Sequence, residues 1–312
     1  MAFPTGIVDA LDPARLRLLV EVDRHGSISA AADACRISQP SATKQLKTLE
    51  AATGEKLIER DGRASRVTEA GALVVTHATR VLDTLQGLEE ELGALRGAEI
   101  GRLSLAASST AGTYVMPSIL QCFADRHPGV KVGIGIGSSA WVAERVAKRD
   151  VSLGIAGDID LPDGVRTERF LDDHLTGITA PGHIEIRDGQ VSIAELERWT
   201  LLVRERGSST RAVSERFMAG CGYHPASRWE LDSDEAIKRS VQAGLGIGFL
   251  SELVVGDEVD RGELATFSIE SCKPMNRAIH LLLPDDRDST PAERAFMATL
   301  GDCCSVSIGG CA

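Results

Sequence analysis

The stretch that most constrains the fold is residues 38–50, which read S-Q-P-S-A-T-K-Q-L-K-T-L-E. Ser38 is placed to cap a helix, and Pro40 is tolerated in the first turn because its missing N–H group would have no helical partner there. Three apolar residues recur at helical spacing and predict a buried stripe, namely Ala42, Leu46 and Leu49. The opposite face is polar and is expected to point outward; it presents Ser41, Thr43, Lys44 and Lys47.

A second short helix is expected just upstream, over residues 27–35 (S-I-S-A-A-A-D-A-C), with Ser27 as its cap. Only Arg36 and Ile37 separate the two helices. The alanines let the helices cross closely, and the second helix then presents donors and charges to a DNA major groove. These features predict a helix-turn-helix, although an ordinary helical hairpin with a solvated face remains an alternative on these residues alone.

Residues 56–71 add two short extended pieces joined by a turn at Asp61-Gly62. Such a hairpin after a helix-turn-helix is typical of a wing that lies along DNA phosphates or a minor groove. Its cations are three clustered arginines, Arg60, Arg63 and Arg66.

From Leu16 to Gly71 the chain resembles the N-terminal winged helix-turn-helix domain of the LysR-type transcriptional regulators. The residues that carry the resemblance are Gly26-Ser27, Ala30-Ala31-Ala32, Ser38-Gln39-Pro40-Ser41, Leu49-Glu50, Gly54, Leu57, Arg60 and Thr68-Glu69-Ala70-Gly71. The resemblance implies sequence-specific binding of double-stranded operator DNA. The residues expected at the DNA are Gln39, Ser41, Thr43, Lys44 and Lys47 on bases and phosphates, with Ser27, Arg63 and Arg66 on the backbone.

A chain of 312 residues with 43% hydrophobic and 25% charged residues is typical of a globular protein with two or three domains. We find no export signal and no apolar stretch of membrane-spanning length, so we expect a cytoplasmic protein without a membrane partner. Residues 1–69 contain 10 Lys and Arg and 10 Asp and Glu, so the net charge of −11 lies entirely in the rest of the chain. The acidic excess therefore does not argue against DNA binding by residues 1–69.

Residues 70–97 are expected to form one long linker helix. Its apolar residues alternate in steps of four and three, which is the pattern of a coiled-coil seam that needs a partner. The seam consists of Val74, Ala78, Val81, Leu85, Leu88, Leu92 and Leu95. Packing on the chain's own sensor domain is an alternative, but the family resemblance favours pairing with a second copy, in a homodimer or a homotetramer.

Residues 98–312 alternate apolar strands with helices, which predicts an α/β domain with a parallel sheet. We expect two lobes joined by crossing strands, with a cleft between them. The first lobe is assigned to about 98–174 and 272–304, and the second to about 175–271. This region resembles the effector-binding domain of the same family, which has the fold of periplasmic binding proteins.

Three hydroxyl-rich stretches fall where strands end and helices begin, at the sheet edge where α/β proteins bind ligands. Helix N-termini with nearby hydroxyls hold small anions, and aromatic residues are scarce at 4%, so we expect a small anionic effector. Capping by Ser and Thr is the alternative for each stretch. The expected effector residues are Ser108, Ser109, Thr110, Ser138, Ser139, Arg204, Ser208 and Ser209.

Residues 204–211 (R-E-R-G-S-S-T-R) and 234–238 (D-E-A-I-K), with the glycine run at 244–248, resemble most the branch of the family that regulates sulfur assimilation and carbon fixation. That resemblance implies sulfur oxyanions, phosphorylated metabolites or small carboxylates as effectors.

Catalysis is not expected, because the seven histidines are dispersed and no H-E-x-x-H, G-x-S-x-G or Walker-type loop occurs. We therefore expect no catalytic residues, no cofactor and no metal site. A small-solute-binding protein or an enzyme that uses the same cleft, without a role at DNA, is the alternative function.

The seven cysteines are odd in number and scattered, which does not predict a disulfide framework and fits a reducing compartment. The three in the tail, Cys303, Cys304 and Cys311, are either a redox sensor or incidental thiols.

Overall fold

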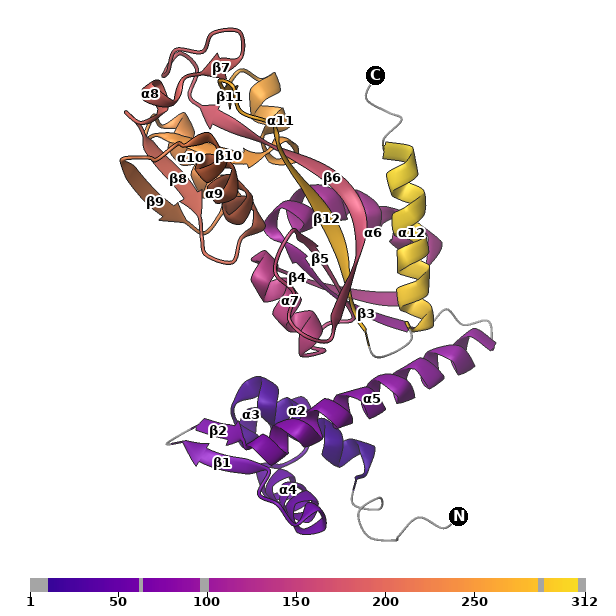
Figure 1. Cartoon of the computed structure of the whole chain (residues 1–312). Helices are drawn as coiled ribbons and strands as arrows, with labels where there is room; N and C mark the ends of the chain where they lie inside the picture. The colour runs from indigo at the N-terminus through magenta and orange to yellow at the C-terminus, as the bar shows by residue number, and fades with distance from the viewer. Residues whose placement is uncertain (1–10, 62–63, 96–100, 286–288, 308–312) are drawn as a thin grey trace. The chain divides into compact units, whose positions relative to one another are not determined.

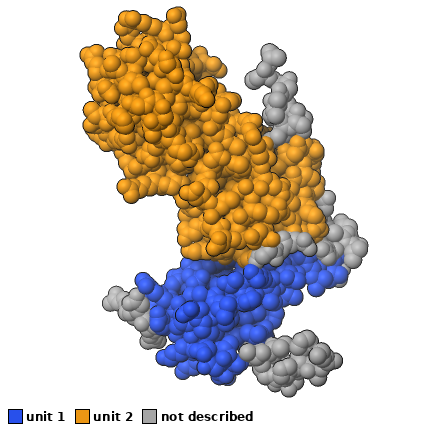
Figure 2. All heavy atoms as spheres, in the orientation of Figure 1, with its two compact units in different colours: residues 1–97 blue, residues 98–312 orange. Residues whose placement is uncertain are grey.

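The computed structural model describes residues 11–61, 64–95, 101–285 and 289–307. The chain forms two compact units, residues 1–97 and residues 98–312 (Figure 2), and each has its own hydrophobic core. Within the described ranges, no helix is both long enough and apolar enough to cross a lipid bilayer.

The described part of the first unit begins with α2 (Pro13–His25), α3 (Ile28–Ala34) and α4 (Gln39–Thr53), as Figure 1 shows. The predicted caps are present: the Ser27 hydroxyl accepts a hydrogen bond from Ala30 N, and the Ser38 hydroxyl accepts one from Ser41 N, both at 3.4 Å. The predicted stripe of α4 is buried in a core shared with α2 and α3. Its members are Ala42, Leu46 and Leu49.

The expected wing is an antiparallel pair, β1 (Ile58–Asp61) and β2 (Ala64–Val67). Gly62, of the predicted Asp61-Gly62 turn, and Arg63 lie outside the described residues. The helix α5 (Glu69–Leu95) follows directly, and Gly71 lets its first turn approach the wing. A Cβ atom on Gly71 would lie 2.1 Å from the carbonyl oxygen of Leu57, so only glycine fits there.

The seam of α5 divides into two parts. Near its start, Ala78 is buried in the core of the first unit, and Val74 packs against that core. Further along, four apolar side chains of the seam are 42–52% exposed within a single chain: Val81, Leu85, Leu88 and Leu92. An apolar stripe this long on one chain is the surface that a second helix covers in a coiled coil.

The second unit contains one mixed sheet with helices on both faces, and the order of its main strands is β4-β3-β5-β12-β6-β10-β8-β9. In the first lobe, β3, β4 and β5 run parallel, as predicted. On one face α6 and α12 cover these strands, and on the other face α7 does. The first lobe holds β3 (Gly101–Ser108), the π-helix η1 (Ala111–Val115), α6 (Met116–Arg126), β4 (Val130–Gly137), α7 (Ser139–Ala147), β5 (Leu153–Gly157) and α12 (Pro291–Ser307).

The second lobe repeats this plan. Its strands β8, β9 and β10 run parallel, with α8 and α9 packed on one face and α10 and α11 on the other. The elements of this lobe are β7 (Gln190–Val191), α8 (Ile193–Leu196), β8 (Thr200–Arg204), α9 (Ser209–Cys221), β9 (Ser227–Leu231), α10 (Asp234–Gln242), β10 (Ile247–Ser251), α11 (Glu252–Asp260) and β11 (Ala265–Ile269).

Two long antiparallel strands, β6 (Val165–Thr179) and β12 (Met275–Pro284), run through both lobes and join them (Figure 1). The sequence predicts that the elements of the second lobe start near residue 175, whereas the strand found there, β6, begins ten residues earlier. The reason is that the first part of β6 is rich in charged, exposed side chains and lacks the apolar run that marks a buried strand.

Two of the cysteines are paired, although the sequence did not predict a disulfide. The structure pairs Cys221, at the end of α9, with Cys272, just before β12, as a disulfide with a Cα–Cα distance of 5.9 Å. The two are 51 residues apart in sequence, so their spacing carried no signal. Cys35 and Cys122 are free. The side chains of Cys303 and Cys304, and all of Cys311, lie outside what the structure describes.

Candidate functional site

The outward face of α4 is the first candidate site. Gln39, Lys44 and Lys47 are exposed, whereas Ser41 and Thr43 are half-buried. The Thr43 hydroxyl donates to the carbonyl oxygen of Gln39 at 3.0 Å, so it is already engaged within the helix. A shallow hollow runs along this face, and it is lined by Pro40, Thr43, Lys44, Lys47, Thr48 and Ala51. The lysines are thus free to reach an external anionic surface.

The remaining DNA candidates lie at the start of α3, on the wing, or outside the described residues. Ser27 is half-buried and caps α3, and Arg66 is exposed on β2. Arg63 lies outside the described residues, and of Arg60 only the backbone, in β1, is described.

The second candidate site is a small cavity between the two lobes, which we call the inner cavity. All eight residues that the sequence singled out for an effector line it, because β3, β4 and β8 end at the same edge of the sheet. Its volume is about 10 Å³, roughly the space of one water molecule. The lining residues are Ser108, Ser109, Thr110, Gly137, Ser138, Ser139, Arg204, Ser208, Ser209, Thr210 and Arg277.

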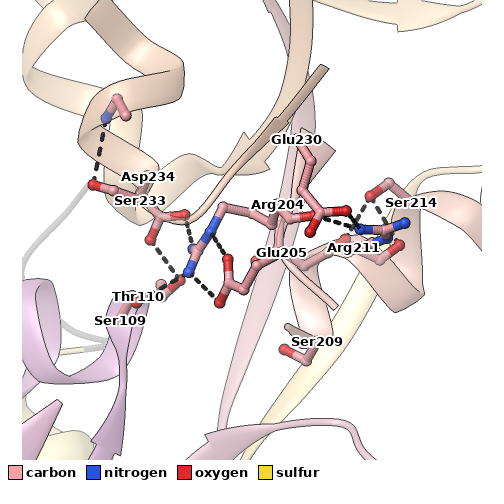
Figure 3. Close-up of polar contacts among 12 residues, drawn as sticks. Ser109, Thr110, Arg204, Glu205, Ser209, Arg211, Ser214, Glu230, Ser233 and Asp234 are labelled. Carbon is pink, nitrogen blue, oxygen red and sulfur yellow. Dashed lines mark hydrogen bonds and ion pairs between the residues drawn. The ribbon is translucent and has the colours of Figure 1, made fainter. Parts of the chain in front are cut away.

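Arg204, at the end of β8, is one of two buried cations at the inner cavity, and its side chain is 3% exposed. Its Nε and Nη2 groups donate to the two oxygens of Glu205 at 2.7 and 2.9 Å, and its Nη1 group donates to Asp234 (Figure 3). Nη2 also donates to Ser109 Oγ in the first lobe at 3.1 Å. The guanidinium therefore links the lobes, and one planar edge of it is filled by the carboxylate of Glu205.

Burial lowers the pKa of Arg204, but the carboxylates of Asp234 and Glu205 raise it by more, so the net pKa lies above the usual value for arginine. Arg204 is therefore a permanent cation. Two carboxylates already neutralise it, which means that an incoming anion has to compete with Glu205 or Asp234 for its N–H groups.

Arg277, on the crossing strand β12, is the second buried cation, and no sequence motif pointed to it. Its Nε donates to Asp173 Oδ2 at 2.6 Å, and its Nη1 donates to the hydroxyls of Ser209 and Thr210, both at 2.8 Å. Nη2 donates to Thr110 Oγ1 at 3.2 Å. Arg277 thus contacts both lobes from the strand that joins them.

The hydrogen bonds of the hydroxyl-rich stretches show which side chains cap a helix and which do not. Ser138 is a cap, because its Oγ accepts from Trp141 N at 3.2 Å. By contrast, Ser208 and Thr110 precede helical segments without making a side-chain cap bond. The hydroxyls of Thr110 and Ser209 instead accept from Arg277, and that of Ser109 accepts from Arg204. Capping therefore accounts for Ser138 but not for the stretches at 108–110 and 208–210.

Arg211, which follows the third hydroxyl stretch, faces away from the inner cavity. Its Nη1 group donates to Glu230 and to the carbonyl oxygen of Arg204, and its Nε donates to Glu215 (Figure 3). In the part of the chain that the structure describes, no three His, Cys, Asp or Glu side chains are grouped in a way that could hold a metal ion.

Comparison with known proteins agrees with this arrangement. Residues 13–72 match the model of the bacterial regulatory helix-turn-helix proteins of the lysR family, and residues 96–304 match that of the LysR substrate binding domain. The chain is 31% identical over 286 residues to the RuBisCO operon transcriptional regulator of Acidithiobacillus ferrooxidans, and the match covers 92% of both chains.

The fold is also found in solved structures. Full-length OxyR of Pseudomonas aeruginosa has a TM-score of 0.71 and 22% identity, with 93% of each chain covered. The regulatory domain of Synechocystis CcmR, solved in complex with 2-PG, has a TM-score of 0.60 and 26% identity, and the match covers 65% of this chain and 96% of that one.

Proposed function

Because the chain belongs to the LysR family of bacterial transcriptional regulators, we propose that its binding to operator DNA is set by a small anion held between the lobes of residues 98–312. The relatives are transcriptional regulators and not enzymes, and this chain is likewise a DNA-binding regulator with an effector-binding domain. Such a regulator has to recognise an operator, pair with a second copy and bind an effector, and a different part of the chain is proposed for each task.

At the DNA, α4 is the element that enters the major groove. Gln39 and Ser41 read base edges from its first turn, and Lys44 and Lys47 contact phosphates. The exposed lysines support this assignment, since they have no carboxylate to neutralise them on the outward face of α4 that lines the hollow. Arg63 and Arg66 of the wing and Ser27 at the start of α3 hold the DNA backbone. Acting on operator DNA, the protein works in the cytoplasm.

Pairing occurs through α5. The exposed stripe from Val81 to Leu92 is proposed to meet the same stripe of a second copy, which places two α4 helices on one operator. Two half-sites then share the recognition, and the phosphate contacts double.

The effector is proposed to be a small anion with one or two acidic groups. The observation that carries this proposal is the convergence of Arg204, Arg277 and the hydroxyls of Ser109, Thr110 and Ser209 on one cavity. The N-termini of α7 and α9 also line that cavity, and the positive end of each helix dipole favours negative charge. The complex of CcmR with 2-PG supports 2-phosphoglycolate as the first ligand to try.

Binding requires the lobes to move. The inner cavity holds about 10 Å³, whereas even a two-carbon acid needs several times that space, so the structure corresponds to a closed arrangement of the lobes. An anion that takes the place of Glu205 on Arg204 pushes the lobes apart and breaks the contacts that Arg204 and Arg277 make across the cleft. The resulting change in the lobes is proposed to alter the spacing of the two reading heads, which requires unequal effector affinity for the two arrangements.

Isothermal titration calorimetry of the full-length protein with 2-phosphoglycolate tests the site. We expect saturable binding that the double variant Ser109→Ala/Ser209→Ala weakens by about tenfold or more, since each hydroxyl contributes a hydrogen bond to the network. Ser118→Ala, an exposed serine outside the cavity, serves as the control. Undiminished affinity in the double variant would show that the inner cavity is not the effector site.

A further inference from the structure

A second cavity, which we call the outer cavity, also lies against the N-terminus of α9. Its volume is about 880 Å³, and it shares only Ser208 and Ser209 with the inner cavity. Ala140 and residues 158–160 contribute its wall from the first lobe, and residues 206–208, α9 and Arg228 of β9 contribute the wall from the second. A cavity of this size lies in the range of about 300–1,000 Å³ that encloses metabolite-sized ligands.

The lining of the outer cavity carries four arginines, and two of them are uncommitted. Arg211 is held by Glu215 and Glu230, and Arg228 lies 3.8 Å from Glu215. Arg206 and Arg216 also line the cavity and are exposed. Within the described part of the chain, the side chains of these two make no hydrogen bond or ion pair.

The acidic side chains of the outer cavity offset three of its four arginines, which leaves one positive charge in excess. Asp158 accepts from the backbone N–H of Ala278 at 3.2 Å and lies 2.8 Å from His280 Nε2. Glu215 is engaged by Arg211. Asp160 is the third acidic residue of the lining, and the described acidic residues form no metal-binding group. The excess charge in the cavity is positive.

We propose that the outer cavity is a second effector site, for a phosphorylated sugar or nucleotide with at least two phosphate groups. Arg206 and Arg216 bind the phosphates, since each guanidinium can donate two parallel hydrogen bonds to one phosphate. Ser208 and Asp160, which also line the cavity, bind the hydroxyls of the sugar. A ligand of this class is too large for the inner cavity.

Because both cavities end on Ser208 and Ser209, a ligand in either one positions the N-terminus of α9. Two ligands that fix the same element bind with a shared coupling free energy, and each changes the affinity for the other by the same factor. The outer site itself does not depend on the anion proposed for the inner cavity, but this coupling rests on that proposed function.

Calorimetry with the full-length protein at 0.15 M salt tests the proposal, with fructose 1,6-bisphosphate and ATP as two-phosphate probes and 2-phosphoglycolate as the one-phosphate probe. We compare wild type with Arg206→Gln/Arg216→Gln. The matched control is Arg198→Gln/Arg239→Gln, which removes the same charge from exposed arginines that line neither cavity.

We expect saturable wild-type binding of at least one two-phosphate probe. The Arg206→Gln/Arg216→Gln variant should lose about tenfold or more in affinity for that probe, because charge-assisted hydrogen bonds disappear, and the control should change by less than about twofold. The affinity of the Arg206→Gln/Arg216→Gln variant for 2-phosphoglycolate should stay within about threefold of wild type.

Three results would overturn the proposal: no saturable binding of either two-phosphate probe, an equal loss in both double variants, or displacement of the bound probe by 2-phosphoglycolate in simple competition. Failure of 2-phosphoglycolate to bind wild type, with the two-phosphate probe still bound, contradicts the inner-cavity proposal alone. The two proposals are thereby tested separately.

Discussion

The cations of α4 and those of the inner cavity stand in opposite surroundings. Lys44 and Lys47 are exposed on a helix surface, whereas Arg204 and Arg277 are only 3% and 5% exposed and are held by carboxylates. An exposed cation contributes little to folding and is available to a partner from outside. A buried cation must be paired in the free protein, so a ligand gains access to it only by exchange. Cationic side chains are thus available to an external partner in one region, whereas in the other they are already paired within the protein.

The largest expected effect is on folding, from Arg277→Met. The substitution leaves the carboxylate of Asp173, which is 2% exposed, without its cationic partner, and such a break costs about 3–5 kcal/mol. Urea unfolding of the full-length protein, followed by circular dichroism, measures the free energy of unfolding of the second unit. In contrast, Lys44→Met should change the stability of the first unit by less than about 0.5 kcal/mol.

A paired substitution sharpens that result. If the loss comes from the uncompensated carboxylate, Arg277→Met together with Asp173→Leu should recover most of it, because no buried charge remains unpaired. A single variant Arg277→Met that unfolds within about 1 kcal/mol of wild type would contradict the role assigned to this pair.

Next in size is the loss of DNA affinity in Lys44→Ala/Lys47→Ala. Removing two phosphate contacts should weaken binding to a DNA fragment selected by the wild-type protein. Log affinity falls as log salt rises, and the steepness of this fall should decrease by about 2. Fluorescence anisotropy at several salt concentrations gives both quantities. Arg239→Ala, an exposed cation on α10, is the control. If the affinity and the slope stay unchanged, α4 does not contact phosphates through these lysines.

Gly157→Ala probes how closely the lobes approach. A Cβ atom on Gly157, at the end of β5, would lie 2.1 Å from Ser209 Oγ and 2.9 Å from Ser209 Cβ on α9. We expect the closed arrangement to lose about 1–3 kcal/mol, as in other overpacked sites, with a lower melting temperature of the second unit. Gly220→Ala on the same helix meets no atom within 4 Å and should be neutral or stabilising. Equal melting temperatures for the two variants would mean that α9 and β5 are not in contact in solution.

The smallest expected effect is a gain. Glu205→Gln removes the carboxylate that occupies Nε and Nη2 of Arg204, while Asp234 still holds Nη1. An anionic effector then competes with a neutral amide, and we expect 2-phosphoglycolate to bind about three- to tenfold more tightly, since a charge-assisted hydrogen bond is weakened in the free state. Titration calorimetry measures this change. Weaker binding in Glu205→Gln would indicate that Glu205 contacts the effector instead of competing with it.

The two regions also differ in how far the sequence predicts them. The features of α4 are local: a cap, a proline in the first turn and an apolar stripe at helical spacing all lie within residues 38–50, and the structure confirms each. The hydroxyl stretches at 108–110, 138–139 and 208–209 were also found from sequence, because each follows an apolar strand, and the structure brings them to one cavity. Their role in effector binding stays a proposal.

The residues that complete the inner cavity had no local signal. Arg277 and Asp173 are 104 residues apart and meet only because β12 and β6 pair in antiparallel register across both lobes. A charged residue beside an apolar run looks like a surface position until that pairing is known. The strand β9 likewise has no apolar run that would predict it, since its residues are mostly exposed and it lies at the edge of the sheet.

The central claim is that an anion between the lobes changes operator binding, and the most direct test is the DNA affinity of the full-length protein with and without saturating 2-phosphoglycolate. We predict a change of about 5- to 150-fold in wild type, the usual size of an allosteric coupling. In Ser109→Ala/Ser209→Ala at the same ligand concentration, this change should be lost while the affinity of the free protein for DNA is retained. If wild type binds 2-phosphoglycolate in the inner cavity and its DNA affinity is nevertheless the same with and without the ligand, the claim is contradicted.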